Sequence, residues 1–140
     1  MEDLTEIYND LIMEHSTNSY NKRKLENATA CKMGHNPNCG DEIKLEIKIN
    51  GDVIEDLAFT GHGCAISQAS TSIMIDTLRG KTIKEAKAIV KTFIEMIKRE
   101  TTSEAELKKL EDAIALKNIS NMPARVKCAL LAWHTIEEMI

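Results

Sequence analysis

Aromatic residues are scarce in this sequence: only 4% of its 140 residues are Phe, Trp or Tyr. Basic and acidic residues are interspersed and leave a formal net charge of −4, so no basic face is available to follow a phosphate backbone. So few rings also provide no platform on which nucleic-acid bases could stack. We therefore expect no nucleic-acid partner.

Long apolar segments are missing as well. No apolar run approaches the roughly 20 residues that cross a bilayer, and the N-terminal segment MEDLTEIYNDLIMEH is acidic and amphipathic, unlike a secretory signal. We expect a cytoplasmic protein with no membrane partner. In a reducing compartment, its four cysteines would be metal ligands, reactive thiols or small buried residues rather than disulfide partners.

No internal repeat or flexible linker divides the chain, and 140 residues can bury a core without disulfides. We expect a single domain over residues 1–140. The spacing of apolar residues predicts a first helix from Leu4 to about Glu14. The polar segment 16–38 is expected to be mostly loop, with a short strand around residues 28–33.

The clearest strand pattern lies in the middle of the chain. Apolar residues alternate with polar ones at Ile43, Leu45, Ile47 and Ile49, which predicts a strand with one buried face. The pair Asn50-Gly51 is typical of a two-residue hairpin, so residues 53–59 should return as an antiparallel strand that ends at the turn 61–63.

Helical patterns follow the hairpin. The first contains Ile66, Ile73 and Leu78 on one face and should end at Gly80. Two further helices should begin with capping boxes formed by Thr82 with Glu85 and by Ser103 with Glu106. The apolar faces of these two helices are Ile83, Ala86, Val90, Phe93 and Ile97, then Leu107, Leu110 and Ile114.

A last helix should begin near Pro123, which suits a first helical turn, and should bury Val126, Leu130 and Trp133 together with Ile136 or Ile140. Strands followed by helices predict an α+β fold, in which a small antiparallel sheet packs against helices on one face.

Three of the four cysteines fall at junctions between these elements. Cys39 precedes the hairpin, Cys64 follows it at a helix start, and Cys128 lies early in the last helix. Asp41 is two residues from Cys39, so in an extended strand both side chains would face the same way. Zinc accepts Cys sulfur and Asp oxygen, and a helix start would stabilise a thiolate at Cys64.

Other readings remain open at this point. Cys128 beside Leu130 and Leu131 could equally be ordinary core. Arg125, on the same helical face as Cys128, could pair with Asp41 or favour a thiolate.

Lone Cys and His residues in loops are usually without a role as ligands, so we rank Cys31 and His35 below the other candidates. We expect His62 at the rim of the site, and His15 and His134 to be structural. Composition and spacing alone thus indicate a metal or thiol site and go no further.

Three segments together carry a family resemblance: NPNCGD (36–41), FTGHGCAISQAS (59–70) and PARVKCALLAW (123–133). In their order, and in the hairpin between the first two, they resemble the iron-sulfur cluster assembly proteins of the IscU and SufU family, which have a NifU N-terminal-like fold. The resemblance covers nearly the whole chain. It implies that Cys39, Asp41, Cys64 and Cys128 converge on one site and that Cys31 lies outside it.

Two features resemble the SufU branch. Scaffold-type members have a His directly before the last cysteine and a shorter interval before it, whereas this chain has Lys127 and an extra helical stretch, roughly residues 98–118. The SufU resemblance implies Zn²⁺ held by three Cys and one Asp. It also implies a sulfurtransferase that works with a SufS-type PLP-dependent cysteine desulfurase and downstream iron-sulfur assembly components.

In that branch the resemblance implies that a His of the desulfurase enters the zinc shell and releases Cys39, which then accepts the persulfide sulfur. An Asp oxygen is a weaker partner for zinc than a thiolate, which makes such a shell easier to open. The main alternative is a scaffold that assembles a [2Fe-2S] cluster on Cys39, Cys64 and Cys128. Lys127 argues against it, because a charged ammonium is no metal ligand. A third reading is a metal-stabilised interaction domain that carries no sulfur.

Overall fold

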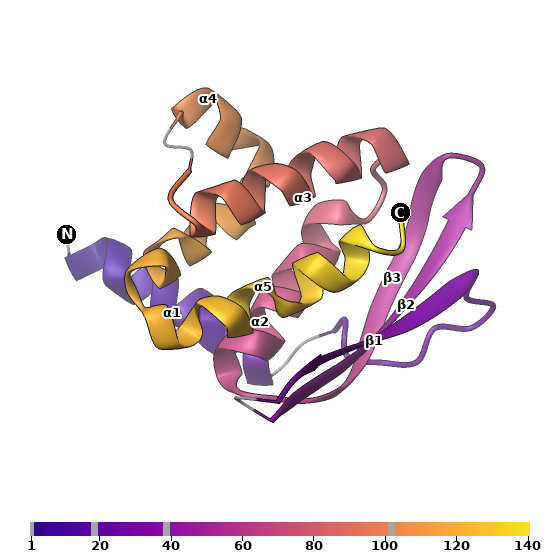
Figure 1. Ribbon diagram of the computed structural model, residues 1–140, viewed down its shortest axis with the longest axis horizontal. Helices are drawn as coiled ribbons and strands as arrows, with labels where there is room; N and C mark the ends of the chain where they lie inside the picture. Colours follow the sequence, from indigo (N-terminus) through magenta and orange to yellow (C-terminus); the bar gives the residue numbers. More distant parts are fainter. Residues whose placement is uncertain (1, 18–19, 38–39, 101–102) are drawn as a thin grey trace.

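The structure, a computed structural model, describes residues 2–17, 20–37, 40–100 and 103–140, with the backbone alone for residues 2–9. A three-stranded antiparallel sheet of order β1-β2-β3 packs on one face against a layer of helices, which confirms the α+β prediction (Figure 1). The elements in chain order are α1 (Glu2–Thr17), β1 (Ala30–Asn36), β2 (Asp41–Asn50), β3 (Val53–His62), α2 (Ala65–Leu78), α3 (Ile83–Ile97), α4 (Glu104–Leu107), the 3₁₀ helix η1 (Lys108–Asn121) and α5 (Pro123–Glu137).

The β2–β3 hairpin follows the predicted pattern, with a small offset at its turn. Ile43, Leu45 and Ile47 are fully buried against the helices, as the alternation requires. Asn50 pairs with Val53, so the loop residues are Gly51 and Asp52 rather than Asn50 and Gly51. Gly51 has a φ of +66°, a left-handed conformation that suits glycine.

The turn between α2 and α3 is hydrogen-bonded to β3. Gly80 follows α2 with a φ of +85°, as predicted for a glycine that ends a helix. Its amide donates a hydrogen bond to the Ile54 carbonyl at 2.8 Å. The predicted capping box is present: the Thr82 hydroxyl accepts from the Glu85 amide at 3.1 Å, and the Glu85 carboxylate accepts from the Thr82 amide at 3.0 Å.

The segment after α3 differs from the predicted amphipathic α-helix. Its longest part is the 3₁₀ helix η1, interrupted by non-helical backbone at Glu111, and Ser103 makes no side-chain capping bond, so the second capping box was wrong. Ile114, predicted on the buried face, is 42% exposed. The residues that are buried recur at every third position, which matches the three residues per turn of a 3₁₀ helix: Leu107, Leu110, Ala113, Leu116 and Ile119.

The core lies between the sheet and the helices. Trp133 of α5 is fully buried, and its ring stacks on Phe93 of α3 with centroids 3.8 Å apart. Ile12 of α1 is also buried, in agreement with the helix predicted there, and the side chains of Leu4, Ile7 and Tyr8 lie outside the described part. None of the helices in the described ranges has both the length and the apolar character needed to cross a membrane.

Candidate metal centre

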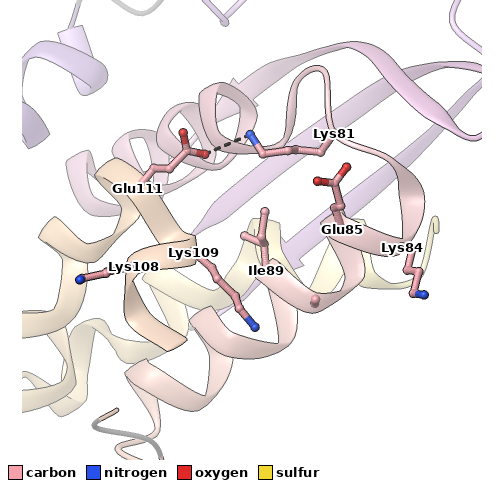
Figure 2. Close-up of a pocket in the computed structure, with 8 residues that line it drawn as sticks. Lys81, Lys84, Glu85, Ile89, Lys108, Lys109 and Glu111 are labelled. Atoms are coloured by element: carbon pink, nitrogen blue, oxygen red, sulfur yellow. Dashed lines mark hydrogen bonds and ion pairs between the residues drawn. The ribbon is translucent and has the colours of Figure 1, made fainter. Parts of the chain in front are cut away.

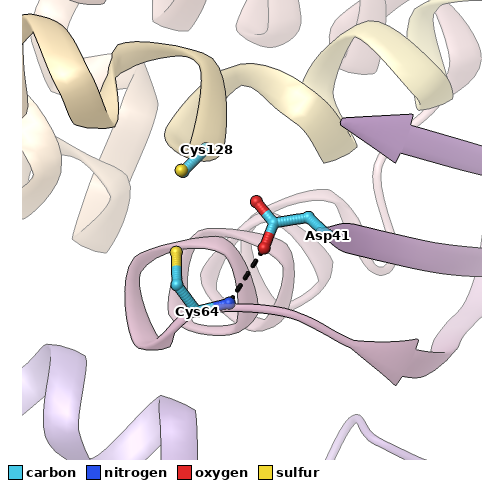
Figure 3. Close-up of side chains that lie close together, drawn as sticks. All are labelled: Asp41, Cys64 and Cys128. Atoms are coloured by element: carbon cyan, nitrogen blue, oxygen red, sulfur yellow. Dashed lines mark hydrogen bonds between the residues drawn. The ribbon is translucent and has the colours of Figure 1, made fainter. Parts of the chain in front are cut away.

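Asp41, Cys64 and Cys128 each bring one potential ligand atom to within 4.8 Å of the other two (Figure 3). They come from the start of β2, the residue before α2 and the first half of α5. Asp41 and Cys128 are buried and Cys64 is half-buried. Within the described ranges, no other group of three His, Cys, Asp or Glu side chains comes together in this way.

Asp41 points inward because it continues the buried face of β2. Its Oδ1 accepts a hydrogen bond from the Cys64 amide at 2.9 Å. Its Oδ2 is buried and has no hydrogen-bond donor among the described residues. A buried carboxylate oxygen without a partner is costly, so this atom calls for a cation or a further donor.

Cys64 occupies the N-cap position of α2, with extended backbone, and its sulfur accepts a hydrogen bond from the Ser67 amide at 3.4 Å. The start of α2 therefore presents the partial positive charge of its amides to this sulfur. The expectation that a helix start sits beside Cys64 is confirmed. Cys128, by contrast, lies within α5 and is 1% exposed.

Gly63 makes room for Asp41. A Cβ on Gly63 would lie 2.6 Å from Asp41 Oδ1, closer than two such atoms can approach. Any side chain at residue 63 would therefore displace the carboxylate.

No sequence pattern points to Gln68, yet its side-chain amide donates a hydrogen bond to the Gly63 carbonyl at 2.9 Å. Gln68 in turn accepts a hydrogen bond from Lys22 at 2.9 Å. These bonds steady the turn that carries Cys64.

Cys39, the remaining predicted ligand and the predicted sulfur acceptor, lies outside the described residues. In the sequence it precedes Asp41 by two residues. Arg125 is exposed on α5, three residues before Cys128. Its two predicted roles, and the metal-ligand assignment itself, stay predictions.

The lower-ranked candidates lie apart from this cluster. Cys31 and His35 are exposed on β1. His62 is exposed at the end of β3, with its Nε2 4.0 Å from Glu42 Oε2, its partner on the outer face of the sheet.

The other two histidines have structural surroundings. His15 lies 2.7 Å from the Ser72 hydroxyl, through its Nδ1, and so links α1 to α2. His134 is exposed on α5, with its Nδ1 3.4 Å from Glu137 Oε1. The contact of His15 agrees with the expectation of a structural role, and for His134 that role stays a prediction.

The donor set fits zinc. Thiolate sulfur and carboxylate oxygen are both zinc ligands, and the buried Oδ2 of Asp41 would gain the partner that the described residues do not give it. The same cysteines would also suit an iron-sulfur cluster, for which thiolates are the usual ligands.

A hollow of about 540 Å³ lies elsewhere, between α3 and η1, and it is lined by four lysines (Figure 2). The ammonium groups of Lys84 and Lys108 point to opposite sides, and Lys81 pairs with Glu111 at 3.1 Å. Because these charges do not converge on one point, the hollow is not a candidate for an anion site.

Comparisons with known proteins agree with the fold. The family described as the NifU-like N terminal domain matches residues 7–140. The zinc-dependent sulfurtransferase SufU of Bacillus subtilis (strain 168) is 40% identical over 96% of this chain and 90% of its own length. The iron-sulfur cluster assembly scaffold protein IscU of Thermotoga maritima is 36% identical over 96% of this chain and 92% of its own length.

Among solved structures, a putative iron-sulfur cluster assembly scaffold protein for the SUF system from Fervidobacterium islandicum AW-1 superimposes with a TM-score of 0.87 at 41% identity. The match covers 95% of this chain and 96% of that one. Both the sequence and the fold lead to one assignment: this chain belongs to the NifU-like N-terminal domain family, the iron-sulfur cluster assembly proteins that include IscU and SufU.

Proposed function

We propose that this chain is a zinc-dependent sulfurtransferase of cytoplasmic iron-sulfur cluster assembly. It would accept persulfide sulfur from a SufS-type PLP-dependent cysteine desulfurase and hand it to downstream assembly components. The observation that carries the proposal is the buried carboxylate of Asp41 between two cysteines, with one oxygen lacking a donor. The similarity to the zinc-dependent sulfurtransferase of Bacillus subtilis supports it.

In this proposal Cys39, Asp41, Cys64 and Cys128 hold the zinc ion. When bound, zinc would keep the coordinating thiols deprotonated, and therefore nucleophilic, at neutral pH. The carboxylate oxygen of Asp41 is a harder ligand than a thiolate and would bind zinc more weakly, so one ligand can leave the coordination shell more easily. Cys64 is held by its cap and Cys128 by the body of α5, which leaves Cys39, two residues before β2 in the sequence, as the thiolate that departs.

The transfer step is a thiol–persulfide exchange. The Cys39 thiolate attacks the terminal sulfur of the persulfide on the desulfurase, and a new S–S bond forms at Cys39. The S–S bond to the desulfurase cysteine breaks, and that cysteine leaves as a thiolate. The sulfur changes carrier without any net oxidation or reduction, so no further reagent is needed.

The test is to locate the sulfur. The protein is incubated with a SufS-type desulfurase, cysteine and PLP, then alkylated, digested and analysed by mass spectrometry. We expect added sulfur on Cys39, and we expect Cys39→Ser to abolish stimulation of the desulfurase. Cys31→Ser is the matched control, because Cys31 is exposed on β1 and lies apart from the cluster, and it should behave as the unmodified protein.

Sulfur on Cys31 or Cys128 together with an active Cys39→Ser variant would overturn the assignment. Measuring the zinc content tests the ligand assignment separately from the sulfur acceptor. Cys64→Ser should lower the zinc content and Cys31→Ser should not. The second candidate is the [2Fe-2S] scaffold, favoured by the similarity to the scaffold protein IscU of Thermotoga maritima.

A further inference from the structure

On the outer face of the sheet, two histidines and a glutamate, residue types that can bind metals, form a row across all three strands. His35 of β1 pairs with Glu42 of β2, and Glu42 pairs with His62 of β3. All three residues are exposed, whereas Asp41 and Ile43 on either side of Glu42 are buried. Because side chains alternate along a strand, Glu42 faces away from the cysteine cluster on the opposite side of the same strand.

We propose that this His-Glu-His row binds a second divalent transition-metal ion, Fe²⁺ or Zn²⁺. This inference rests on the strand register and does not depend on the zinc-dependent transfer proposed above.

The backbone spacing suits one ion above Glu42. Neighbouring strands lie about 4.8 Å apart, so the two histidines flank the carboxylate at one strand spacing on each side. Residues directly opposite in an antiparallel pair have Cβ atoms about 5 Å apart. An imidazole with a metal bond of about 2 Å spans such a distance. His62 Nε2 and Glu42 Oε2 are already 4.0 Å apart.

Among the described residues, the one ion pair within this row is the long contact between His62 and Glu42. A separation of 4.0 Å is too long for a hydrogen bond, so the His62 and Glu42 side chains, 73% and 49% exposed, are open to another partner. The structure describes no hydrogen bond or ion pair for the ring of His35, which is exposed, borders a hollow that Lys127 and His134 of α5 also line, and can turn about its Cα–Cβ bond. This side-chain rotation is needed, because in the described conformation the ligand atoms of His35, Glu42 and His62 do not come together as those of the cysteine cluster do.

The ligand types define the class of ion. Two imidazoles and one carboxylate, with the remaining positions open to water, suit divalent iron and are also zinc ligands. An exposed site of three ligands should exchange its ion more readily than a buried cysteine site. The row would therefore hold an exchangeable ion beside the cysteine cluster, on the other face of β2.

The test uses the full chain after the cysteine cluster has been saturated with zinc and excess metal removed. Zn²⁺, or Fe²⁺ under anaerobic conditions, is then titrated in by calorimetry. Zn²⁺ binding is also followed through the ring signals of the four histidines by NMR. We expect one further ion per chain, with shifts at His35 and His62 and none at His15. Comparing the two titrations decides between the ions.

Three variants should each abolish the second binding event: His35→Gln, Glu42→Gln and His62→Gln. Because these side chains are exposed, their unfolding curves without metal should match that of the unmodified protein. His134→Gln is the matched control, since His134 is also exposed and lies 3.4 Å from a carboxylate, but it belongs to α5 and not to the row on the sheet. The proposal fails if no further ion binds, if binding survives all three changes, or if His134→Gln weakens it equally.

Discussion

The two oxygens of Asp41 have different environments, and this difference makes the residue central to the cluster. One oxygen accepts the Cys64 amide and so ties the start of β2 to the start of α2. The other is buried without a described donor and lies on the side of the carboxylate nearer Cys128 (Figure 3). A carboxylate held in this way can offer an oxygen to a metal while its orientation is fixed by the protein.

Replacing Asp41 with cysteine should separate zinc affinity from sulfur transfer. A fourth thiolate binds zinc more firmly than a carboxylate and closes the shell, so we expect Asp41→Cys to hold zinc more tightly and to accept sulfur more slowly. Competition with a chelator measures the affinity, and desulfurase stimulation measures the transfer. A folded variant that gained both properties, or lost both, would refute a tuning role for Asp41.

At the scale of elements, local patterns predicted most of the framework and missed features that depend on packing. The alternation from Ile43 to Ile49 set which face of β2 is buried, and hence the inward direction of Asp41. The three-residue spacing from Leu107 to Ile119 was present in the sequence, but reading it in α-helical register predicted the wrong kind of helix. The approach of Cys64 to Cys128 depends on how α5 packs on α2, and no spacing along the chain encodes that contact.

Ser70 links these two helices by hydrogen bonds. Its buried hydroxyl donates to the Ala129 carbonyl of α5 at 2.6 Å and accepts from the Trp133 indole at 2.9 Å. Ala129 is adjacent to Cys128 in the sequence, and Ser70 lies in the helix that Cys64 caps. The bridge therefore holds the helix that contains Cys128 against the helix that Cys64 caps.

Ser70→Ala should lower the free energy of unfolding by about 1–3 kcal/mol, because it leaves the buried indole N–H without its acceptor. Urea unfolding of the zinc-free protein measures this cost. Thr77→Val is the control, since the Thr77 hydroxyl bonds only to the Ile73 carbonyl of its own helix, and it should cost less. Equal costs for the two variants would show that the bridge between helices adds nothing.

At the scale of the whole molecule, a charged network centred on Asp56 holds the segment after α1 against β3 and α2. Asp56 accepts hydrogen bonds from Arg23 at 2.9 Å and from Arg79 at 2.9 Å. Burial raises the pKa of Asp56, but the bonds from Arg23, Arg79 and the Leu57 amide outweigh it and hold the pKa below its ordinary value. The stabilisation is therefore full above the ordinary aspartate pKa of about 3.9 and is lost as the pH falls through the lower folded value.

Asp56→Asn should consequently destabilise the protein by about 2 kcal/mol at neutral pH, since it removes charge-assisted hydrogen bonds. The difference from the unmodified protein should narrow as the pH falls below about 4. Unfolding of the zinc-free protein at both pH values tests this expectation. Asp52→Asn, in the exposed hairpin loop, should have little effect at either pH. If the difference in unfolding free energy between Asp56→Asn and the unmodified protein stayed constant with pH, the proposed link between Asp56 ionisation and stability would be wrong.

Lys127 allows a test of what the whole molecule does. It is exposed beside the buried Cys128, and its ammonium cannot ligate a metal while charged. Assembly of a stable cluster on three cysteines would call for a further ligand, which this position does not supply. We expect the unmodified protein, given iron and sulfide, to form no [2Fe-2S] cluster that survives in air.

The variant Lys127→His adds an imidazole at that position and should hold a cluster somewhat better, as judged by visible absorbance after exposure to air. His134→Lys provides the converse control: it exchanges the same two residue types farther along α5, and should leave cluster retention unchanged. A robust [2Fe-2S] spectrum from the unmodified protein would instead favour the scaffold. In that case the cysteines would be ligands of the product cluster rather than of a zinc ion, because the same thiolates cannot hold both.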